Sequence, residues 1–224
     1  MKLIPRNTIF YILQGKLRGR RWIVGSGQHS YWLGSYEYKN QLFFAKVVKK
    51  GAVVYDIGAH VGFYTLLASI LVGSNGKVFA FEPSLRNIRY LKKNLRLNRC
   101  DNVTLIEAAV SDKDGQAYFD EGFASYSGHL SLKGNLKVET ISLNKFVLED
   151  GFPPPDFIKI DTEGSELLIL SDAKEMLIKY KPTIFLSTHG ADLHLRCWAF
   201  LNSLNYDLQL INENINNANE LMAF

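Results

Sequence analysis

The stretch that decides the fold is Ala52-Val53-Val54-Tyr55-Asp56-Ile57-Gly58-Ala59-His60-Val61-Gly62. Its first four residues form a short apolar, β-branched run, which predicts a buried strand, and the glycines that follow predict a tight turn. Residues 63–72 are apolar almost all round, as in a buried helix, and Gly73 follows them. The stretch therefore predicts a strand, a turn and a helix in that order.

The same order of strand and helix recurs along the chain. Further strands are predicted over residues 77–82, 103–110, 157–161 and 183–188, and Pro83 is placed where it can open a helix. Buried strands that alternate with helices are joined by right-handed crossovers into a parallel sheet. The predicted fold class is therefore α/β, a doubly wound, Rossmann-like and mostly parallel sheet. In such a sheet, ligands bind at the carboxyl ends of the strands, near the point where the strand order reverses.

At 224 residues the chain is long enough to bury one full core, and we expect a single domain. Residues 1–50 are interpreted as an N-terminal extension packed on the core, and residues 51–211 as the domain itself. Within that domain, residues 113–150 form an insertion whose loop over 122–129 is expected to be mobile and to close over a ligand. Residues 212–224 are interpreted as a polar C-terminal tail, of which the aperiodic stretch 212–220 is expected to be poorly ordered.

Composition disfavours several classes of protein. With 26 basic and 22 acidic side chains, the net charge of +4 is too small to indicate a dedicated nucleic-acid binder, and the basic cluster after Pro83 is interpreted as a solvated helix face. No apolar segment approaches the roughly 20 residues that cross a bilayer. Residues 1–13 lack the features of a signal peptide, and the two cysteines, Cys100 and Cys197, suit a reducing compartment. We therefore expect a cytoplasmic protein.

Two acidic residues mark the ends of the first two strands. Asp56 stands two residues before Gly58, and a glycine there lets the backbone approach a ligand while the next helix offers N–H groups. His60 stands where the dinucleotide fingerprint needs a second glycine, which disfavours a diphosphate. Glu82 ends the second strand, twenty residues after Gly62, and a carboxylate there can accept both hydroxyl hydrogens of a ribose. A nucleoside ligand with a positive charge fits this pattern.

The Asp-x-Gly-x-x-x-Gly pattern, followed by Glu82-Pro83, resembles the cofactor-binding half of class I S-adenosylmethionine-dependent methyltransferases. The stretches Ile158-Lys159-Ile160-Asp161-Thr162-Glu163-Gly164-Ser165-Glu166 and Gly34-Ser35-Tyr36-Glu37 are similar to the FkbM family of these enzymes. The resemblance runs from about Gly34 to His189. It implies the class I methyltransferase fold, S-adenosylmethionine as the cofactor and O-methylation of sugars or natural products.

The resemblance also implies which residues hold the cofactor. Gly58, Ala59 and Gly62 would surround its methionine portion, Glu82 its ribose and Ala109 its adenine. The remaining cofactor-binding candidates are Tyr36, Glu37, Asp56 and Asp161. The family commonly has Asn where this sequence has His60, so we assign no side-chain role to that residue.

Three residues at the ends of the later strands are the catalytic candidates. Asp161 and Glu163 end the strand over 157–161, and their carboxylates would attract a cationic cofactor. His189 follows the strand over 183–188, and its imidazole, with an ordinary pKa of about 6.5, is the candidate general base, with Glu163 as the competing proton acceptor. Glu166 is interpreted only as a favourable charge at the start of a helix. The three candidates could gather Mg²⁺ or Mn²⁺, but no tight ligand spacing supports a metal site and none is predicted.

The predicted function is methyl transfer from S-adenosylmethionine to a hydroxyl of a sugar, glycan or natural product, by in-line attack of the acceptor oxygen. Phe123 and Tyr126 are expected to stack on the acceptor. Two alternatives stay open: a nicotinamide-dependent oxidoreductase, which His60 disfavours, and a binding module that keeps the fold without the chemistry. The expected partner is a small-molecule or glycan acceptor and not nucleic acid, and the sequence indicates no oligomeric state.

Overall fold

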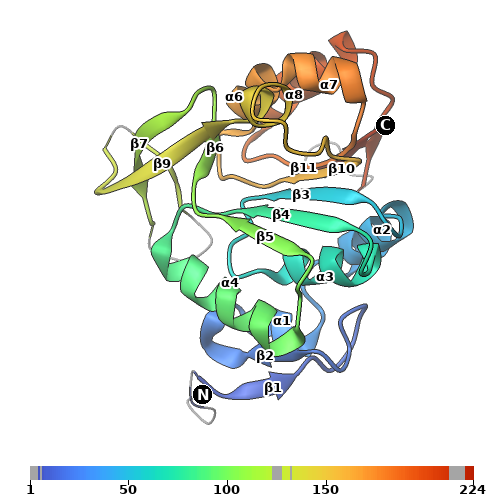
Figure 1. The fold of residues 1–224 in the computed structure, drawn as a ribbon, viewed down its shortest axis with the longest axis vertical. Helices are drawn as coiled ribbons and strands as arrows, with labels where there is room; N and C mark the ends of the chain where they lie inside the picture. Colours follow the sequence, from blue (N-terminus) through green and yellow to red (C-terminus); the bar gives the residue numbers. More distant parts are fainter. Residues whose placement is uncertain (1–4, 6, 123–127, 132, 212–219) are drawn as a thin grey trace.

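The computed structural model describes residues 5, 7–122, 128–131, 133–211 and 220–224. Five parallel strands form the body of its central sheet (Figure 1): β3 (Val53–Ile57), β4 (Lys77–Phe81), β5 (Val103–Ile106), β10 (Phe157–Ile160) and β11 (Thr183–Ser187). Two further strands, β12 (Leu208–Leu210) and β13 (Glu220–Ala223), complete the order β12-β13-β11-β10-β3-β4-β5. The strand order reverses between β3 and β10. The predicted α/β class with a mostly parallel sheet is therefore confirmed.

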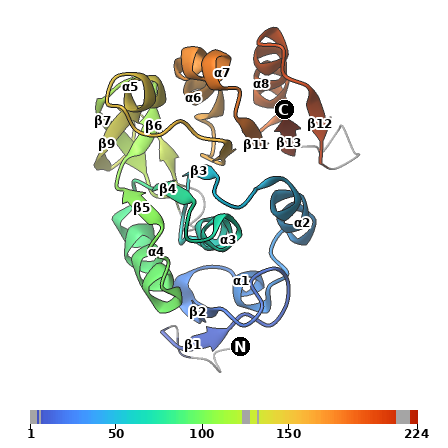
Figure 2. The same ribbon diagram turned by 45° about the vertical axis from the view of Figure 1, so that its right-hand side comes forward.

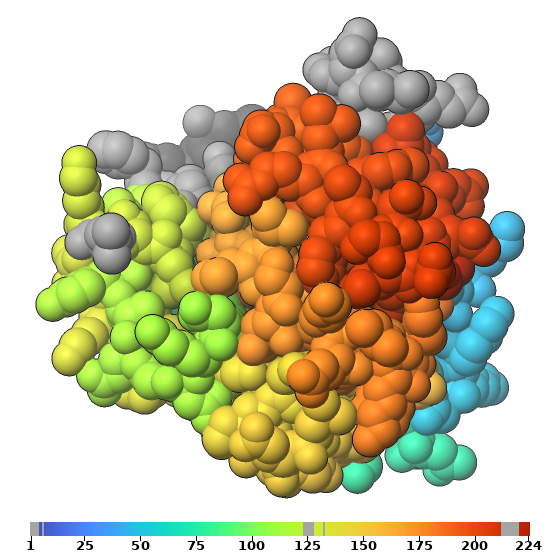
Figure 3. Space-filling model, turned by 90° about the horizontal axis from the view of Figure 1, so that it is seen from above, coloured from blue at the N-terminus to red at the C-terminus, as the bar shows by residue number. Residues whose placement is uncertain are grey.

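Helices cover both faces of this sheet (Figure 2). One face carries α2 (Tyr38–Val47), α3 (Phe63–Val72) and α4 (Leu85–Asn98), and the other carries α5 (Leu143–Leu148), α6 (Glu166–Asp172), α7 (Lys174–Tyr180) and α8 (Ala191–Ser203). Figure 3 looks onto the end of the molecule that α7 and α8 occupy. Neighbouring residues of a strand point to opposite faces, so Val54 packs with Phe44 of α2 while Tyr55 packs with Phe146 of α5. None of the helices in the described ranges is long and apolar enough to span a membrane.

The predicted strand over 103–110 is in fact two strands. β5 ends at Ile106, and Ala109 begins β6 (Ala109–Ser111) in a second sheet of order β6-β9-β7-β8, whose other strands are β7 (Gly115–Asp120), β8 (His129–Leu130) and β9 (Leu136–Ser142). Ala109 packs there with Phe119 and Val138. Apolar residues stand on both sides of the break, in the partly exposed β5 and in the buried β6, so periodicity alone does not separate the two strands. The predicted loop roles of Phe123 and Tyr126 lie outside the described residues.

The interpretation of residues 212–224 as a polar tail missed a strand near the end of the chain. Residues 220–223 form β13, which pairs antiparallel with both β11 and β12. Leu221, Met222 and Ala223 are buried, and the burial of this short apolar run holds the strand in the sheet. Residues 212–219, which lie outside the described ranges, are polar, and for this reason the short strand after them was not predicted.

The residues before β3 form a layer beside α3 and α4. β1 (Ile9–Tyr11) and β2 (Arg21–Ile23) make an antiparallel hairpin, followed by a 3₁₀ turn (Val24–Ser26), α1 (His29–Leu33) and α2. Trp22 and Tyr31 are buried against Phe63 of α3. Phe44 of α2 packs on Phe157 of β10, with ring centroids 4.9 Å apart. These contacts place α1 and the start of α2 beside the carboxyl ends of the strands.

Candidate active site

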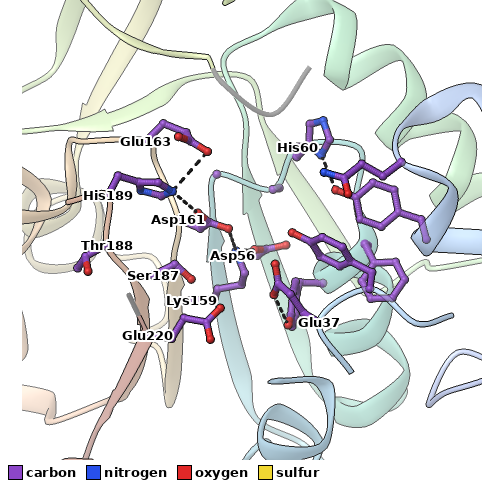
Figure 4. A pocket seen from close by; sticks show the side chains of 17 residues that line it. Glu37, Asp56, His60, Lys159, Asp161, Glu163, Ser187, Thr188, His189 and Glu220 are labelled. Atoms are coloured by element: carbon purple, nitrogen blue, oxygen red, sulfur yellow. Dashed lines mark hydrogen bonds and ion pairs between the residues drawn. The ribbon is translucent and has the colours of Figure 1, made fainter. Parts of the chain in front are cut away.

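A cavity opens at the carboxyl ends of β3, β10 and β11, beside the reversal of strand order (Figure 4). Among the residues that line it are eight of the predicted ones: Tyr36, Glu37, Asp56, Gly58, Ala59, Asp161, Glu163 and His189. A second cavity shares Gly58, Asp161 and Glu163 with the first and adds Glu82 and Ala109. The sequence-predicted residues are thus brought together in two adjoining cavities.

The turn after β3 needs glycine at two positions. Gly58 has a φ of +78°, and a Cβ there would lie 1.9 Å from the carbonyl oxygen of Asp161. This close approach lets the ends of β3 and β10 meet. Gly62 lines neither cavity. It has a φ of +92° directly before α3, and a Cβ there would lie 3.2 Å from Leu91 of α4, so its role in the structure is to let the two helices pack.

Glu82, at the end of β4, is buried and held by three donors. Its carboxylate accepts hydrogen bonds from the backbone N–H groups of His60 (2.8 Å) and Ser84 (2.9 Å) and from the side chain of Asn87 (3.2 Å). Burial raises the pKa of Glu82 to about 7, against the effect of these donors. The carboxylate therefore faces the second cavity in a fixed position and titrates near neutral pH.

Lys159, in the middle of β10, is a site residue that sequence reasoning missed. Its buried ammonium lies 3.2 Å from Asp161 Oδ2, 4.0 Å from Asp56 Oδ1 and 5.0 Å from the centre of the Tyr64 ring. Burial opposes the charge, but the carboxylates of Asp161 and Asp56 outweigh burial and raise the pKa of Lys159. The signal in the sequence is a lysine inside an otherwise apolar strand, because a buried lysine requires a carboxylate partner.

Asp56, at the end of β3, has one carboxylate oxygen that is hydrogen-bonded and one that lies 4.0 Å from the Lys159 ammonium. Oδ2 accepts a hydrogen bond from the hydroxyl of Thr65 at 2.6 Å. Oδ1 is buried and has no hydrogen-bond partner among the described residues. Burial raises the pKa of Asp56, against the effects of Lys159 and Thr65. A buried carboxylate oxygen without a donor suits a positively charged ligand in the first cavity.

Asp161, Glu163 and His189 form one cluster at the ends of β10 and β11. His189 Nε2 lies 3.6 Å from Asp161 Oδ1 and 3.4 Å from Glu163 Oε1 (Figure 4). Burial disfavours the imidazolium, but the carboxylates of Glu163, Glu166 and Asp161 outweigh burial and raise the pKa of His189 to about 10. The prediction of an ordinary pKa for His189 is therefore wrong, and the side chain is protonated at neutral pH.

Glu166 stands in the first turn of α6, as predicted, but its role goes beyond that of a helix-terminal charge. Its fully buried side chain accepts hydrogen bonds from His189 Nδ1 (3.0 Å) and from the backbone N–H groups of Thr162 and Gly164 (both 3.1 Å). Burial opposes its ionisation, but His189 and the backbone donors lower the pKa of Glu166. A carboxylate only accepts, so Nδ1 carries a proton and Nε2 is turned toward Asp161 and Glu163. Glu166 is a positioning residue for His189.

The opposite wall of the first cavity comes from α2, α3 and β13. The Tyr64 hydroxyl donates to Glu37 Oε2 at 2.8 Å, and the Asn40 side chain donates to Glu220 Oε1 at 2.6 Å. Burial raises the pKa values of Tyr36 and Glu220, and the charge of Glu37 adds to both shifts. Among the described residues, five carboxylates line this cavity, those of Glu37, Asp56, Asp161, Glu163 and Glu220, whereas the cationic groups are Lys159 and His189.

Comparison with known proteins agrees with this architecture. The family model of the methyltransferase FkbM domain matches residues 56–208, more than half of the chain. The hexuronic acid methyltransferase AglP of Haloferax volcanii is 27% identical over 121 residues, which are 53% of this chain and 48% of that protein.

Solved structures share the fold. The methyltransferase FkbM of Methylobacillus flagellatus has a TM-score of 0.59 and 18% identity, and the match covers 88% of this chain and 53% of that one. Fibrillarin of Aeropyrum pernix, solved with S-adenosyl-L-methionine bound, has a TM-score of 0.52 and 12% identity over 79% of this chain and 67% of that one. The chain spans about half the length of AglP and of the Methylobacillus protein. Its fold is that of class I methyltransferases, and by the match over residues 56–208 the chain belongs to the FkbM methyltransferase family.

Proposed function

We propose that this chain transfers a methyl group from S-adenosylmethionine to a hydroxyl of a sugar, a glycan or a natural product. The observation that carries the proposal is the excess of carboxylates over cations in the first cavity, next to the buried Glu82 of the second. A nucleoside that bears a sulfonium and an ammonium group complements both features. The likeness to AglP, a hexuronic acid methyltransferase, supports a carbohydrate acceptor.

The residues present fit this cofactor. Asp56 Oδ1, which is buried and without a hydrogen-bond donor in the described part of the chain, would accept from the ammonium group, and Glu82 from the ribose hydroxyls. Tyr36, Glu37, Gly58 and Ala59 would line the methionine portion, Ala109 the adenine, and Asp161 would add negative charge near the sulfonium. S-adenosylmethionine, when bound, supplies an activated methyl group.

Glu163 is the proton acceptor in this proposal. Asp161 is held by two cations, Lys159 at Oδ2 and His189 at Oδ1, whereas Glu163 has an ion-pair partner only at Oε1 within the described ranges. A carboxylate with one oxygen unengaged can take the proton of the acceptor hydroxyl as the hydroxyl oxygen attacks. His189, protonated and fixed by Glu166, would hold Glu163 and Asp161 in place. Alignment of the acceptor with the methyl group would supply the remaining rate acceleration.

Ligand binding and label transfer separate this function from its alternatives. We expect S-adenosylhomocysteine to raise the melting temperature of the purified chain and NADH to leave it unchanged. With methyl-labelled S-adenosylmethionine and a panel of sugars, uronic acids and glycans, the label should pass to an acceptor. Stabilisation by NADH alone would support an oxidoreductase, and cofactor binding without label transfer would support a binding module. That nucleic acid is not a partner stays a prediction, because it depends on net charge alone.

Methyl transfer is expected to survive removal of divalent metal ions. The ligand atoms of Asp161, Glu163 and His189 lie within 4.8 Å of one another, a spacing that a metal ion could use. The proton on His189 Nε2 already supplies a positive charge between the two carboxylates, so we expect turnover to be the same before and after dialysis against EDTA. A loss of turnover that added Mn²⁺ restores would contradict this expectation.

A further inference from the structure

The positive charge of this protein is concentrated in two segments. Residues 1–36 and 85–99 together contain 12 of the 26 Lys and Arg residues and none of the 22 Asp and Glu residues. The rest of the chain is therefore net acidic. The small overall charge of +4 hides this asymmetry, and an uneven distribution of this kind is typical of proteins that meet a polyanionic surface.

The fold brings the two basic segments together. β2 packs along α4, where the backbone N–H of Arg21 donates to Asn98 Oδ1 (2.9 Å) and the backbone N–H of Ile23 donates to Asn94 Oδ1 (3.2 Å). Figures 1 and 2 both show the hairpin of β1 and β2 beside α4. A shallow cavity at this junction is lined by Tyr11, Arg20, Arg21 and Arg99, among other residues. The basic residues of α4, predicted to form a solvated helix face, thus lie next to the basic residues of the hairpin.

Apolar side chains are exposed on the same hairpin. Ile9, Tyr11 and Leu13 are 51%, 61% and 49% exposed. All three residues of β1 are exposed, which is unusual for a strand made of Ile, Phe and Tyr. The exposed basic side chains of Lys16, Arg18 and Arg20 follow directly in the chain. We call this set of exposed side chains, Ile9, Tyr11, Leu13, Lys16, Arg18 and Arg20, the hairpin face; Tyr11 and Arg20 line the same shallow cavity.

We propose that the hairpin face docks on the surface of a membrane that contains anionic phospholipids. Exposed aliphatic and aromatic side chains gain by entering the boundary between headgroups and acyl chains, while neighbouring Lys and Arg side chains attract anionic headgroups. A nucleic acid would use the basic groups and could stack on Tyr11, but it would leave Ile9 and Leu13 without an apolar environment. The combination of both kinds of side chain on one hairpin therefore favours the lipid surface. This docking does not depend on the methyl-transfer activity proposed above.

Co-sedimentation of the full chain with lipid vesicles tests the proposal. We expect the chain to sediment with vesicles of phosphatidylcholine and phosphatidylserine, to release them as salt is raised, and to bind poorly to phosphatidylcholine alone. The triple variant Lys16→Gln/Arg18→Gln/Arg20→Gln should bind the anionic vesicles about a hundredfold more weakly, because each charge removed is expected to weaken binding roughly fivefold. The double variant Ile9→Ser/Tyr11→Ser should also lose binding while keeping its melting temperature, because both side chains are exposed.

A matched control removes three positive charges elsewhere. Lys113→Gln/Lys137→Gln/Lys174→Gln changes exposed lysines near β7, on β9 and on α7, the last of these on the end of the molecule seen in Figure 3 and away from the hairpin. It should bind vesicles as the wild type does. Equal binding by wild type and the hairpin charge variant would overturn the proposal. It would also be overturned if an RNA oligonucleotide bound the chain, displaced the vesicles and required the hairpin charges but not Ile9 and Tyr11.

Discussion

Replacing Glu163 by glutamine is expected to slow methyl transfer at neutral pH by about 10²- to 10⁴-fold, the usual contribution of a positioned proton acceptor. Glutamine has the same side-chain length and must adopt the same left-handed backbone conformation, with a φ of +57°, but its amide cannot accept the proton. The Glu163 side chain is 31% exposed, so its neutralisation should change the melting temperature and the affinity for S-adenosylhomocysteine little. Turnover of labelled cofactor and calorimetry with S-adenosylhomocysteine measure the two effects.

Two further variants make the Glu163→Gln experiment specific. Glu149→Gln neutralises an exposed carboxylate just after α5, away from both cavities, and should keep full turnover. His189→Gln should lower turnover and keep cofactor affinity, because it removes the positive group that holds Glu163 and Asp161. If Glu163→Gln turned over the cofactor at the wild-type rate, another group would have to accept the proton, and the assignment would be wrong.

The parts of the site that the sequence predicts are those that a strand end fixes locally. Asp56, Gly58 and Glu82 each stand where a buried strand meets a turn, and a parallel sheet places all such ends along one edge. Residues far apart in the sequence can then be expected in one place without knowledge of their contacts. The same argument predicts that Asp161 and His189, which follow different strands, lie close together, and His189 Nε2 is 3.6 Å from Asp161 Oδ1.

The sequence could not predict features that depend on long-range pairing. Glu163 and Glu166 stand three residues apart, and the sequence predicted a site role for Glu163 but only a helix-terminal charge for Glu166. Glu166 is nevertheless the fully buried one, because Thr162, Gly164 and His189 supply donors for it in the folded chain. Glu220 reaches the cavity because β13 inserts beside β11, and the polar residues before it gave no sign of a strand. In both cases the outcome is decided by tertiary contacts and not by local propensity.

The affinity for S-adenosylhomocysteine is expected to depend strongly on Glu82. Glu82→Ala would remove two charge-assisted hydrogen bonds to the ribose, each worth about 1.5–3 kcal/mol, which corresponds to a loss of about 10²- to 10⁴-fold in affinity. The same change leaves the N–H groups of His60 and Ser84 without their acceptor, so the alanine variant is also expected to be less stable. Glu82→Gln keeps the volume of the side chain and separates the loss of charge from the loss of packing.

The pH dependence of that affinity tests the assignment of Glu82 independently of folding. Because burial raises the pKa of Glu82 to about 7, the wild-type carboxylate is mostly ionised above that pH and mostly protonated below it. Only the ionised form accepts from both ribose hydroxyls, so the dissociation constant should rise as the pH falls from about 8 to about 6. Glu82→Gln, which does not titrate, should bind more weakly at high pH and show a flat profile over the same range. Glu149→Gln should keep the wild-type profile. A wild-type affinity that does not change across this range, or a Glu82→Gln variant that retains the slope, would show that Glu82 does not hold the ribose.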